Sequence, residues 1–172
     1  MVIYNIFSRL LDYPDQELKD NLGLIMESVM QDTALEERER LRVQDVVAWM
    51  QGTDLLALQE VYVKTFDLTP EHSLHLTHHL FGDDRGRGPA LVDLAEHYKG
   101  AGLQAVEGEL PDYLPLILEY VSTLDETQAR VFLNDAAKVL DVLAANLEKA
   151  QSPYAALVRV IANHGRLARF AA

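Results

Sequence analysis

Apolar side chains recur three and four positions apart along most of this chain. That spacing places them on one face of an α-helix, whereas a half-buried strand would need apolar and polar residues to alternate. No segment alternates over enough length to favour a strand. The helical stripes are Ile3, Ile6, Phe7 and Leu10; Leu18, Leu22, Ile25 and Val29; Leu55, Leu58, Tyr62 and Phe66; Phe132, Ala136, Val139, Leu140, Leu143 and Leu147; and Tyr154, Leu157, Val158 and Ile161. The periodicity therefore predicts an all-α protein.

Capping residues mark where some of these helices begin. Asp125 with Gln128 three positions later has the pattern of a capping box. Ser152 followed by Pro153 is typical of a helix start, because the hydroxyl can cap and proline lacks an N–H that would otherwise need a partner. Residues 113–121 read YLPLILEYV and are apolar nearly all round. A helix of that kind is predicted at the centre of a bundle.

The size and composition of the chain indicate one self-supporting domain. Its 172 residues are 49% hydrophobic and contain no linker or repeat. We expect a single helical domain over residues 1–172, a multi-helix bundle of about eight or nine helices. There is no cysteine. This excludes a disulfide framework, a thiolate metal site and a cysteine nucleophile.

The charge balance restricts the partners. The formal net charge is −12, which disfavours nucleic acid because binding there depends on neutralising phosphates with Lys and Arg. An acidic surface instead favours cationic partners. The first residues lack a basic leader, and no apolar run reaches the about 18 residues that a membrane helix needs. We therefore expect a cytoplasmic protein that does not insert into a membrane.

Four histidines, His72, His75, His78 and His79, lie three and four positions apart. On a helix, His75 and His79 would share a face with Asp83 one turn later, which is a spacing that can hold a metal. The HExxH signature of a metalloprotease is absent, and leucines lie between the histidines. Packing histidines, peptide-contacting histidines and a metal site all remain open on this pattern.

The histidines are followed by GDDRGRGP at residues 82–89, a stretch with three glycines and four charges. Free N–H groups and arginines could hold an anion, but the Lys-Ser/Thr pair of a phosphate loop is missing, and two aspartates would repel a phosphate. The alternatives are a local turn closed by ion pairs or a recognition surface on a loop. No nucleophile motif is present, so we do not expect an enzyme.

Peptide recognition is the third candidate. An all-α domain can accept an amphipathic helix in an apolar groove rimmed by charge. This chain has aromatic residues beside charged connections, namely Tyr62, Phe66, Phe81 and Tyr98, together with many acids. Such a groove would suit a cationic helix.

Five sequence blocks then occur in a fixed order. They are SRLLDYPD (8–15), YVKTFD (62–67), SLHLTHHLFGDDRGRGPALVDL (73–94), YKGAGLQ (98–104) and ELPDYLPLILEY (109–120). Together they closely resemble the NarJ-type assembly chaperones of respiratory nitrate reductase, also called its delta subunit, within the class of redox-enzyme maturation chaperones. The resemblance runs from the first helix to about Ile161.

The resemblance implies an all-helical cytoplasmic chaperone that catalyses no reaction. It implies binding to the N-terminal segment of the nitrate reductase catalytic (alpha) subunit, which keeps the apoenzyme competent for cofactor insertion and delays its attachment to the membrane. The cofactor implied is bis-molybdopterin guanine dinucleotide, inserted into the client and not stably held by the chaperone. Proteins of molybdenum cofactor biosynthesis are further implied partners.

The resemblance places the family's most diagnostic positions on Phe66, Asp67, His79, Gly82, Arg85, Arg87, Gly88, Leu91, Leu94 and Tyr98. With the groove hypothesis they give the candidate peptide-binding set Tyr62, Phe66, Asp67, His75, His79, Gly82, Arg85, Arg87, Gly88, Leu91, Leu94 and Tyr98. Asp84 departs from the family pattern, which usually has serine there. We expect the groove between the helices at 62–66 and 74–80. Arg85 and Arg87 would brace its mouth through Asp67, Asp83 or Asp84, or grip a client carboxylate.

Two other functions remain open at this point. One is a metal-dependent enzyme that uses His75, His79 and Asp83. The other is a permanent structural subunit of a larger complex.

Overall fold

The computed structural model describes residues 2–81, 85–103 and 108–167. Within these ranges the chain forms nine α-helices, one π-helical turn and one 3-10 turn, and no strand. The all-α prediction is confirmed. The elements are α1 (Val2–Leu11), α2 (Gln16–Gln31), α3 (Glu37–Gly52), α4 (Leu55–Tyr62), the π-helix η1 (Val63–Asp67), the 3-10 helix η2 (Pro70–His72), α5 (Leu76–Phe81), α6 (Arg87–Gly100), α7 (Leu114–Thr123), α8 (Glu126–Lys149) and α9 (Ala155–Leu167).

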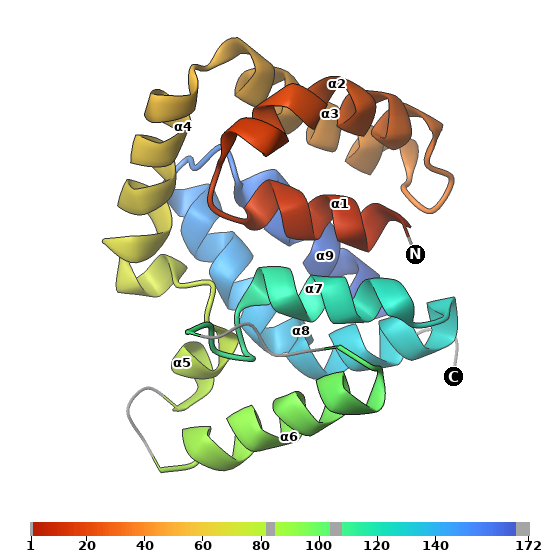
Figure 1. Cartoon of the computed structure of the whole chain (residues 1–172), viewed down its shortest axis with the longest axis vertical. Coiled ribbons are helices and arrows are strands. Elements are labelled where there is room, and N and C mark those ends of the chain that lie inside the picture. The colour runs from red at the N-terminus through yellow and green to blue at the C-terminus, as the bar shows by residue number, and fades with distance from the viewer. Residues whose placement is uncertain (1, 82–84, 104–107, 168–172) are drawn as a thin grey trace.

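The long helices form the centre of the bundle. α9 packs along α8, α1 packs along α7, and α2 and α3 form a helical hairpin at the end opposite α6 (Figure 1). Gly165 lets α9 approach α8 closely, since a Cβ there would lie 2.7 Å from the carbonyl oxygen of Leu133. Six of the ten residues of α7 are buried, which confirms the central helix predicted for residues 113–121.

The helix starts follow the predicted caps, with one exception. The Asp125 carboxylate accepts a hydrogen bond from the Gln128 N–H at 2.8 Å, and the predicted capping box is present. The last helix was predicted to begin at Ser152-Pro153, and this is wrong. Its first residue is Ala155, because the carbonyl of Ser152 accepts the Ala155 N–H at 3.1 Å in a preceding turn.

The stripe from Leu55 to Phe66 is not one regular helix. α4 ends at Tyr62 and continues as the π-helix η1, in which the Leu68 N–H donates to the carbonyl of Val63 at 3.0 Å. The Nδ1 atom of His72 lies 3.1 Å from the carbonyl oxygen of Thr65, so η2 folds back on the π-turn. π-turns inside helices occur frequently at functional sites.

None of the described helices has the length and apolar character that crossing a bilayer would require.

Candidate functional site

Two of the sequence blocks, residues 73–94 and 109–120, are joined by a short backbone clamp. The Leu76 N–H donates to the carbonyl of Asp112 at 3.0 Å, and the Leu114 N–H donates to the carbonyl of Leu74 at 2.8 Å. Between them, residues 75 and 113 form an isolated antiparallel bridge. The start of α5 is thereby joined to the start of α7.

A buried carboxylate organises this clamp. Asp112 has no exposed surface, and its Oδ2 accepts hydrogen bonds from the Thr77 N–H at 3.1 Å and from the Thr77 hydroxyl. The Nδ1 atom of His75 lies 3.3 Å from Oδ1. Arg87 approaches from α6, with Nη2 at 3.6 Å from Oδ2 and Nε donating to the Thr77 hydroxyl at 3.0 Å. One carboxylate therefore fixes α5, α6 and the start of α7 together.

These contacts favour the ionised form of the carboxylate. Burial by itself would raise the pKa of Asp112, but the hydrogen bonds from His75 and Thr77 and the charge of a protonated His75 outweigh burial and lower the pKa below its ordinary value. The carboxylate is thus a negative charge held inside the protein beside Arg87.

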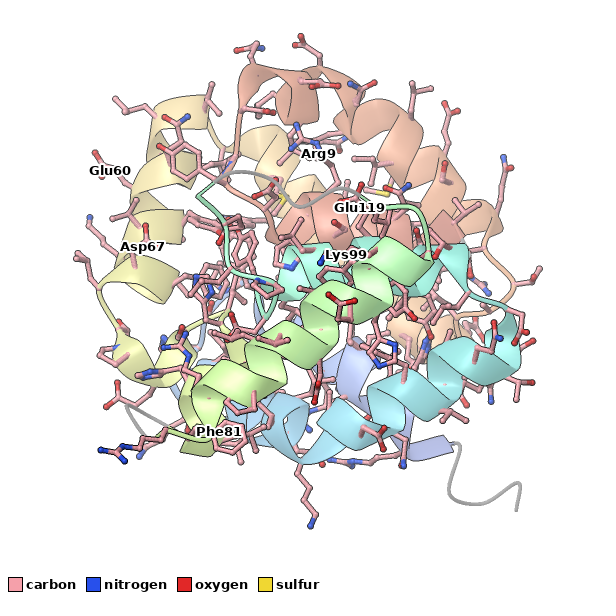
Figure 2. All side chains as sticks on the ribbon, turned by 60° about the horizontal axis from the view of Figure 1, so that its bottom comes forward. Arg9, Glu60, Asp67, Phe81, Lys99 and Glu119 are labelled. Carbon is pink, nitrogen blue, oxygen red and sulfur yellow. The ribbon has the colours of Figure 1, made fainter. Side chains whose placement is uncertain are left out.

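The structure gives Arg87 a partner that was not predicted. Arg87 was predicted to pair with Asp67, Asp83 or Asp84, or with a client carboxylate, but it faces Asp112. Asp67 is exposed at the outer edge of η1 (Figure 2), and residues 83 and 84 lie outside the described residues. Sequence spacing favoured the near acids, whereas the fold brings Arg87 to a carboxylate from another segment.

A second hydrogen-bonded chain links two more blocks to the clamp. The hydroxyls of Tyr62 and Tyr113 lie 2.6 Å apart, and the Tyr113 hydroxyl donates to Asp12 Oδ1 at 3.1 Å. The Tyr62 hydroxyl also donates to the carbonyl of Leu11 at 3.2 Å. Burial raises the pKa of both tyrosines well above the ordinary value, so both remain protonated donors.

Among the described residues, Tyr62 and Phe66 do not line an open groove between residues 62–66 and 74–80. Tyr62 and Phe66 are buried, and their rings pack against Tyr154 at centroid distances of 6.1 and 5.0 Å. Because both side chains are buried, they can support a client-binding surface but cannot themselves contact a client in this conformation. Their assignment to the client site stays a prediction.

The histidines have separate environments. His75 precedes α5, and its ring lies over Tyr113 at 5.3 Å. The Nε2 atom of His79 lies 2.7 Å from the carbonyl oxygen of Ser73, and His79 borders a pocket of about 140 Å³ with Leu80 and α8. Among the described residues no three His, Asp or Glu side chains are grouped so that they could hold a metal, and Asp83 is not described.

The other candidate residues lie on or near α6. Tyr98 is buried, Leu91 and Leu94 are half-buried, and Arg85 and Gly88 are exposed. Gly82 lies outside the described residues. The structure thus brings part of the predicted set to one helix, away from the buried pair Tyr62 and Phe66.

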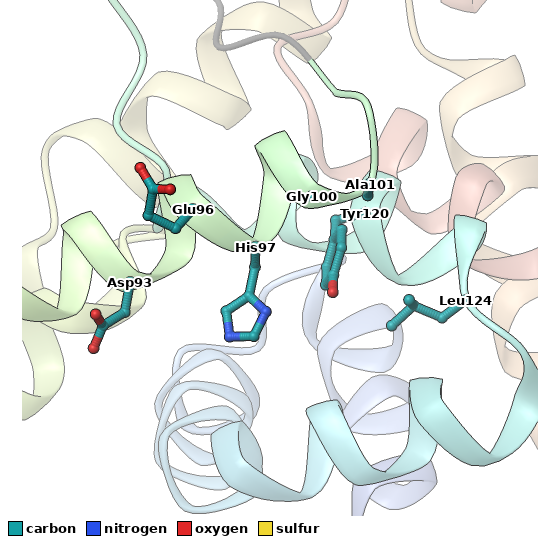
Figure 3. A pocket seen from close by; sticks show the side chains of 7 residues that line it. All are labelled: Asp93, Glu96, His97, Gly100, Ala101, Tyr120 and Leu124. Atoms are coloured by element: carbon teal, nitrogen blue, oxygen red, sulfur yellow. The ribbon is translucent and has the colours of Figure 1, made fainter.

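An open pocket of about 580 Å³ adjoins this helix (Figure 3). Asp93 and Glu96 stand on its α6 side, His97 points into it, and Tyr120 and Leu124 from the end of α7 form its apolar side. The lining is completed by Gly100 and Ala101. The pocket combines an acidic wall, in which Glu96 is paired with Lys99 at 2.7 Å, with an apolar wall.

Aromatic rings lie behind the pocket. The ring of Tyr120 packs against Tyr98 at 5.3 Å and against Phe132 of α8 at 5.1 Å, while His97 lies 6.1 Å from Phe132. Of this cluster only Tyr98 was among the predicted site residues. Asp112 was also missed, although it is the only charged residue in LPDYLPLIL at 110–118, an unusual position that could have marked it.

The described residues form a helical domain with a pocket that is acidic on one side and apolar on the other, an arrangement suited to binding. Consistent with this, residues 30–159 match the family model described as nitrate reductase delta subunit, and the chain belongs to that family.

Two bacterial chaperones are similar over most of the chain. One is the nitrate reductase molybdenum cofactor assembly chaperone NarJ of Escherichia coli K12, 36% identical over 157 residues that cover 91% of this chain and 66% of that protein. Another is the probable NarJ of Bacillus subtilis 168, 32% identical over 160 residues, with 93% of this chain and 86% of that protein covered. The chain thus spans about two thirds of the length of the Escherichia coli relative.

The Mycobacterium tuberculosis H37Rv protein named nitrate reductase-like protein NarX is 33% identical over 119 residues. This match covers 69% of the present chain and 18% of NarX. A segment of this family therefore also occurs within a much larger protein.

Proposed function

We propose that this protein is an assembly chaperone for a respiratory nitrate reductase. It binds the N-terminal segment of the catalytic (alpha) subunit and keeps the apoenzyme competent for molybdenum cofactor insertion before membrane attachment. Membership of the delta subunit family supports the kind of client. The observation that carries the binding mode is the open pocket between α6 and the end of α7, with one acidic and one apolar wall.

In this proposal the client segment binds as a cationic amphipathic helix. Its apolar face contacts Tyr120 and Leu124, and its cations lie near Asp93 and Glu96. The acidic wall and the net charge of −12 mainly speed the encounter, because rim charges affect association more than final affinity. Ordering the client segment costs about 2–5 kcal/mol, which keeps the complex reversible.

The chaperone itself performs no chemical step in this proposal. Bis-molybdopterin guanine dinucleotide is inserted into the client, and proteins of molybdenum cofactor biosynthesis would meet the chaperone–client complex. The clamp around Asp112 has a supporting role, since it holds the pocket wall α6 against α5 and the start of α7.

Calorimetric titration with a synthetic peptide of the alpha subunit N-terminus tests the proposal. We expect heat of binding and an affinity that falls as salt is added. A peptide of the same composition with its apolar residues out of helical register should not bind. Absence of heat with the authentic peptide would refute the proposed function.

The acidic wall is tested by the double variant Asp93→Asn, Glu96→Gln. We expect affinity to fall about two- to tenfold at low salt, with a weaker salt dependence, because two exposed charge pairs are lost. The matched control is Asp20→Asn, Glu27→Gln, which removes the same charges from exposed positions of α2 at the far end of the molecule. Equal losses in both variants would show that only net charge matters.

Co-purification separates a chaperone from a permanent subunit. A chaperone should accompany the cofactor-free alpha subunit and be absent from the mature complex. Stoichiometric retention in the mature enzyme would instead support the structural subunit.

A further inference from the structure

α6 is the helix least integrated into the bundle. Of its fourteen residues, all of which are described, only Tyr98 is buried, whereas α7 buries six of its ten. It packs mainly against the short helix α5. Figure 1 shows it at the edge of the molecule, and its C-terminal end contacts α7 and α8 through the Tyr98–Tyr120 and His97–Phe132 ring pairs. The wall that it forms can therefore move at lower cost than the α7 wall opposite.

Among the described residues, two polar attachments hold α6 in place, one near each end. At the start, Arg87 donates to the Thr77 hydroxyl and faces Asp112. At the end, the Tyr98 hydroxyl donates to the carbonyl of Pro111 at 2.5 Å. The acceptors at the two ends are Thr77 and Asp112, which bind each other, and Pro111, which precedes Asp112. α6 is therefore fastened to the clamp rather than embedded in the core.

The side of α6 that faces the bundle carries apolar residues, although Val92 on its outer side is also apolar and is 61% exposed. Leu91, Leu94, Ala95 and Tyr98 are spaced i, i+3, i+4 and i+7, and all are at least partly buried. At its C-terminal end this stripe rests on the ring of Tyr120, which packs on Phe132. One of the protein's own helices, α6, therefore packs on the surface around Tyr120.

The pocket beside α6 is open and has a volume of about 580 Å³. Its two helical walls differ in how firmly they are packed, since α7 buries six of its ten residues and α6 buries one of its fourteen. Any widening of the pocket on binding is therefore expected at α6 rather than at α7.

We propose that the face of α7 and α8 beneath α6, centred on Tyr120 and Phe132, is part of the docking surface for the client helix. α6 is a placeholder on this surface, and an incoming cationic amphipathic helix pushes it outward. This inference rests on the proposed function and adds to it the surface used and the element displaced.

Distance measurements between spin labels test the displacement. The chain has no cysteine, so labels attach only at introduced sites. Val92→Cys on α6 and Val131→Cys on α8 are suitable, since these side chains are 61% and 57% exposed. We expect the distance between them to increase when the synthetic client peptide saturates the protein. The control pair Leu24→Cys with Val131→Cys, on α2 and α8, should keep its distance.

The outcomes separate the two proposals when calorimetry is run on the same labelled proteins. Binding heat with an unchanged 92–131 distance would overturn the displacement of α6 and leave the proposed function standing. An absence of heat would overturn both. An increase of the label-to-label distance in both pairs would mean that the whole bundle loosens, and it would also count against a specific role of α6.

The attachment at Tyr98 gives an independent test. Tyr98→Phe keeps the ring but removes the hydrogen bond to Pro111, so the displaced form becomes more populated and client affinity should rise about fivefold. The control is Tyr154→Phe, since the buried Tyr154 hydroxyl has no hydrogen-bond partner among the described residues and its loss should leave affinity unchanged. Equal or weaker client affinity in folded Tyr98→Phe would overturn the placeholder role.

Discussion

Replacing Asp112 by alanine tests whether the buried carboxylate is the centre of the clamp. The substitution would leave the Thr77 N–H and hydroxyl and the Arg87 guanidinium without their acceptor. Hydrogen bonds to a charged acceptor are worth about 1.5–3 kcal/mol each, and they are not additive within one network. Removing one partner of a buried ion pair typically costs about 3–5 kcal/mol. We therefore expect Asp112→Ala to lower the free energy of unfolding by about 3–5 kcal/mol.

Urea unfolding followed by circular dichroism at neutral pH measures this loss. The midpoint should fall while the dependence on urea concentration stays the same. Asp93→Ala is the control, because its exposed carboxylate should matter by no more than about 0.5 kcal/mol. A loss below about 1 kcal/mol for Asp112→Ala would refute the central role of this carboxylate.

The same variant has a defined pH dependence. The folded-state pKa of Asp112 lies below that of an unfolded aspartate, which is about 3.9. The ionised carboxylate therefore favours folding above that pH, and its contribution disappears as the pH falls through the lowered folded-state pKa. The stability difference between wild type and Asp112→Ala should be full at neutral pH and shrink in acid. A difference that grows in acid would contradict the assigned direction.

Other predictions concern single contacts. Arg87→Ala should lower the free energy of unfolding by about 1–3 kcal/mol while the protein still folds. Arg87→Lys should restore only part of this loss, because lysine cannot contact Thr77 and Asp112 through two nitrogen atoms at once. Chemical unfolding of both variants measures the loss, and full recovery of stability with lysine would contradict the assigned contacts. Gly165→Ala should cost about 1–3 kcal/mol, since the added Cβ would lie 2.7 Å from the Leu133 carbonyl oxygen; a thermal melt equal to wild type would show that α8 and α9 separate easily.

The fold was largely predictable because its signals are local. Helical periodicity and the Asp125 cap depend on residues three or four positions apart, and both predictions are confirmed. Periodicity does not tell whether an apolar face meets the core or stays open. Tyr62 and Phe66 therefore fitted a groove on the sequence, whereas in the fold they pack on Tyr154, far along the chain.

The candidate site was predictable only in part, because its key contacts are long-range. The block at residues 73–94 contains His75 and Arg87, but their shared partner Asp112 lies in another segment, 35 positions from Thr77. No local spacing relates these segments. The sequence also did not predict that Tyr120 lines a pocket, because this residue belongs to a helix that was predicted to lie in the central core.

The clamp between residues 74–76 and 112–114 also closes the intervening chain into a loop. Two backbone hydrogen bonds and the contacts of Asp112 hold the ends of that loop together. These contacts offset the entropy cost of closing the loop. Each doubling of the length of a flexible loop adds only about 0.6 kcal/mol to the cost of closing it. We therefore expect that the segment that carries α6 can lengthen, shorten or change its sequence while the remaining helices keep their packing.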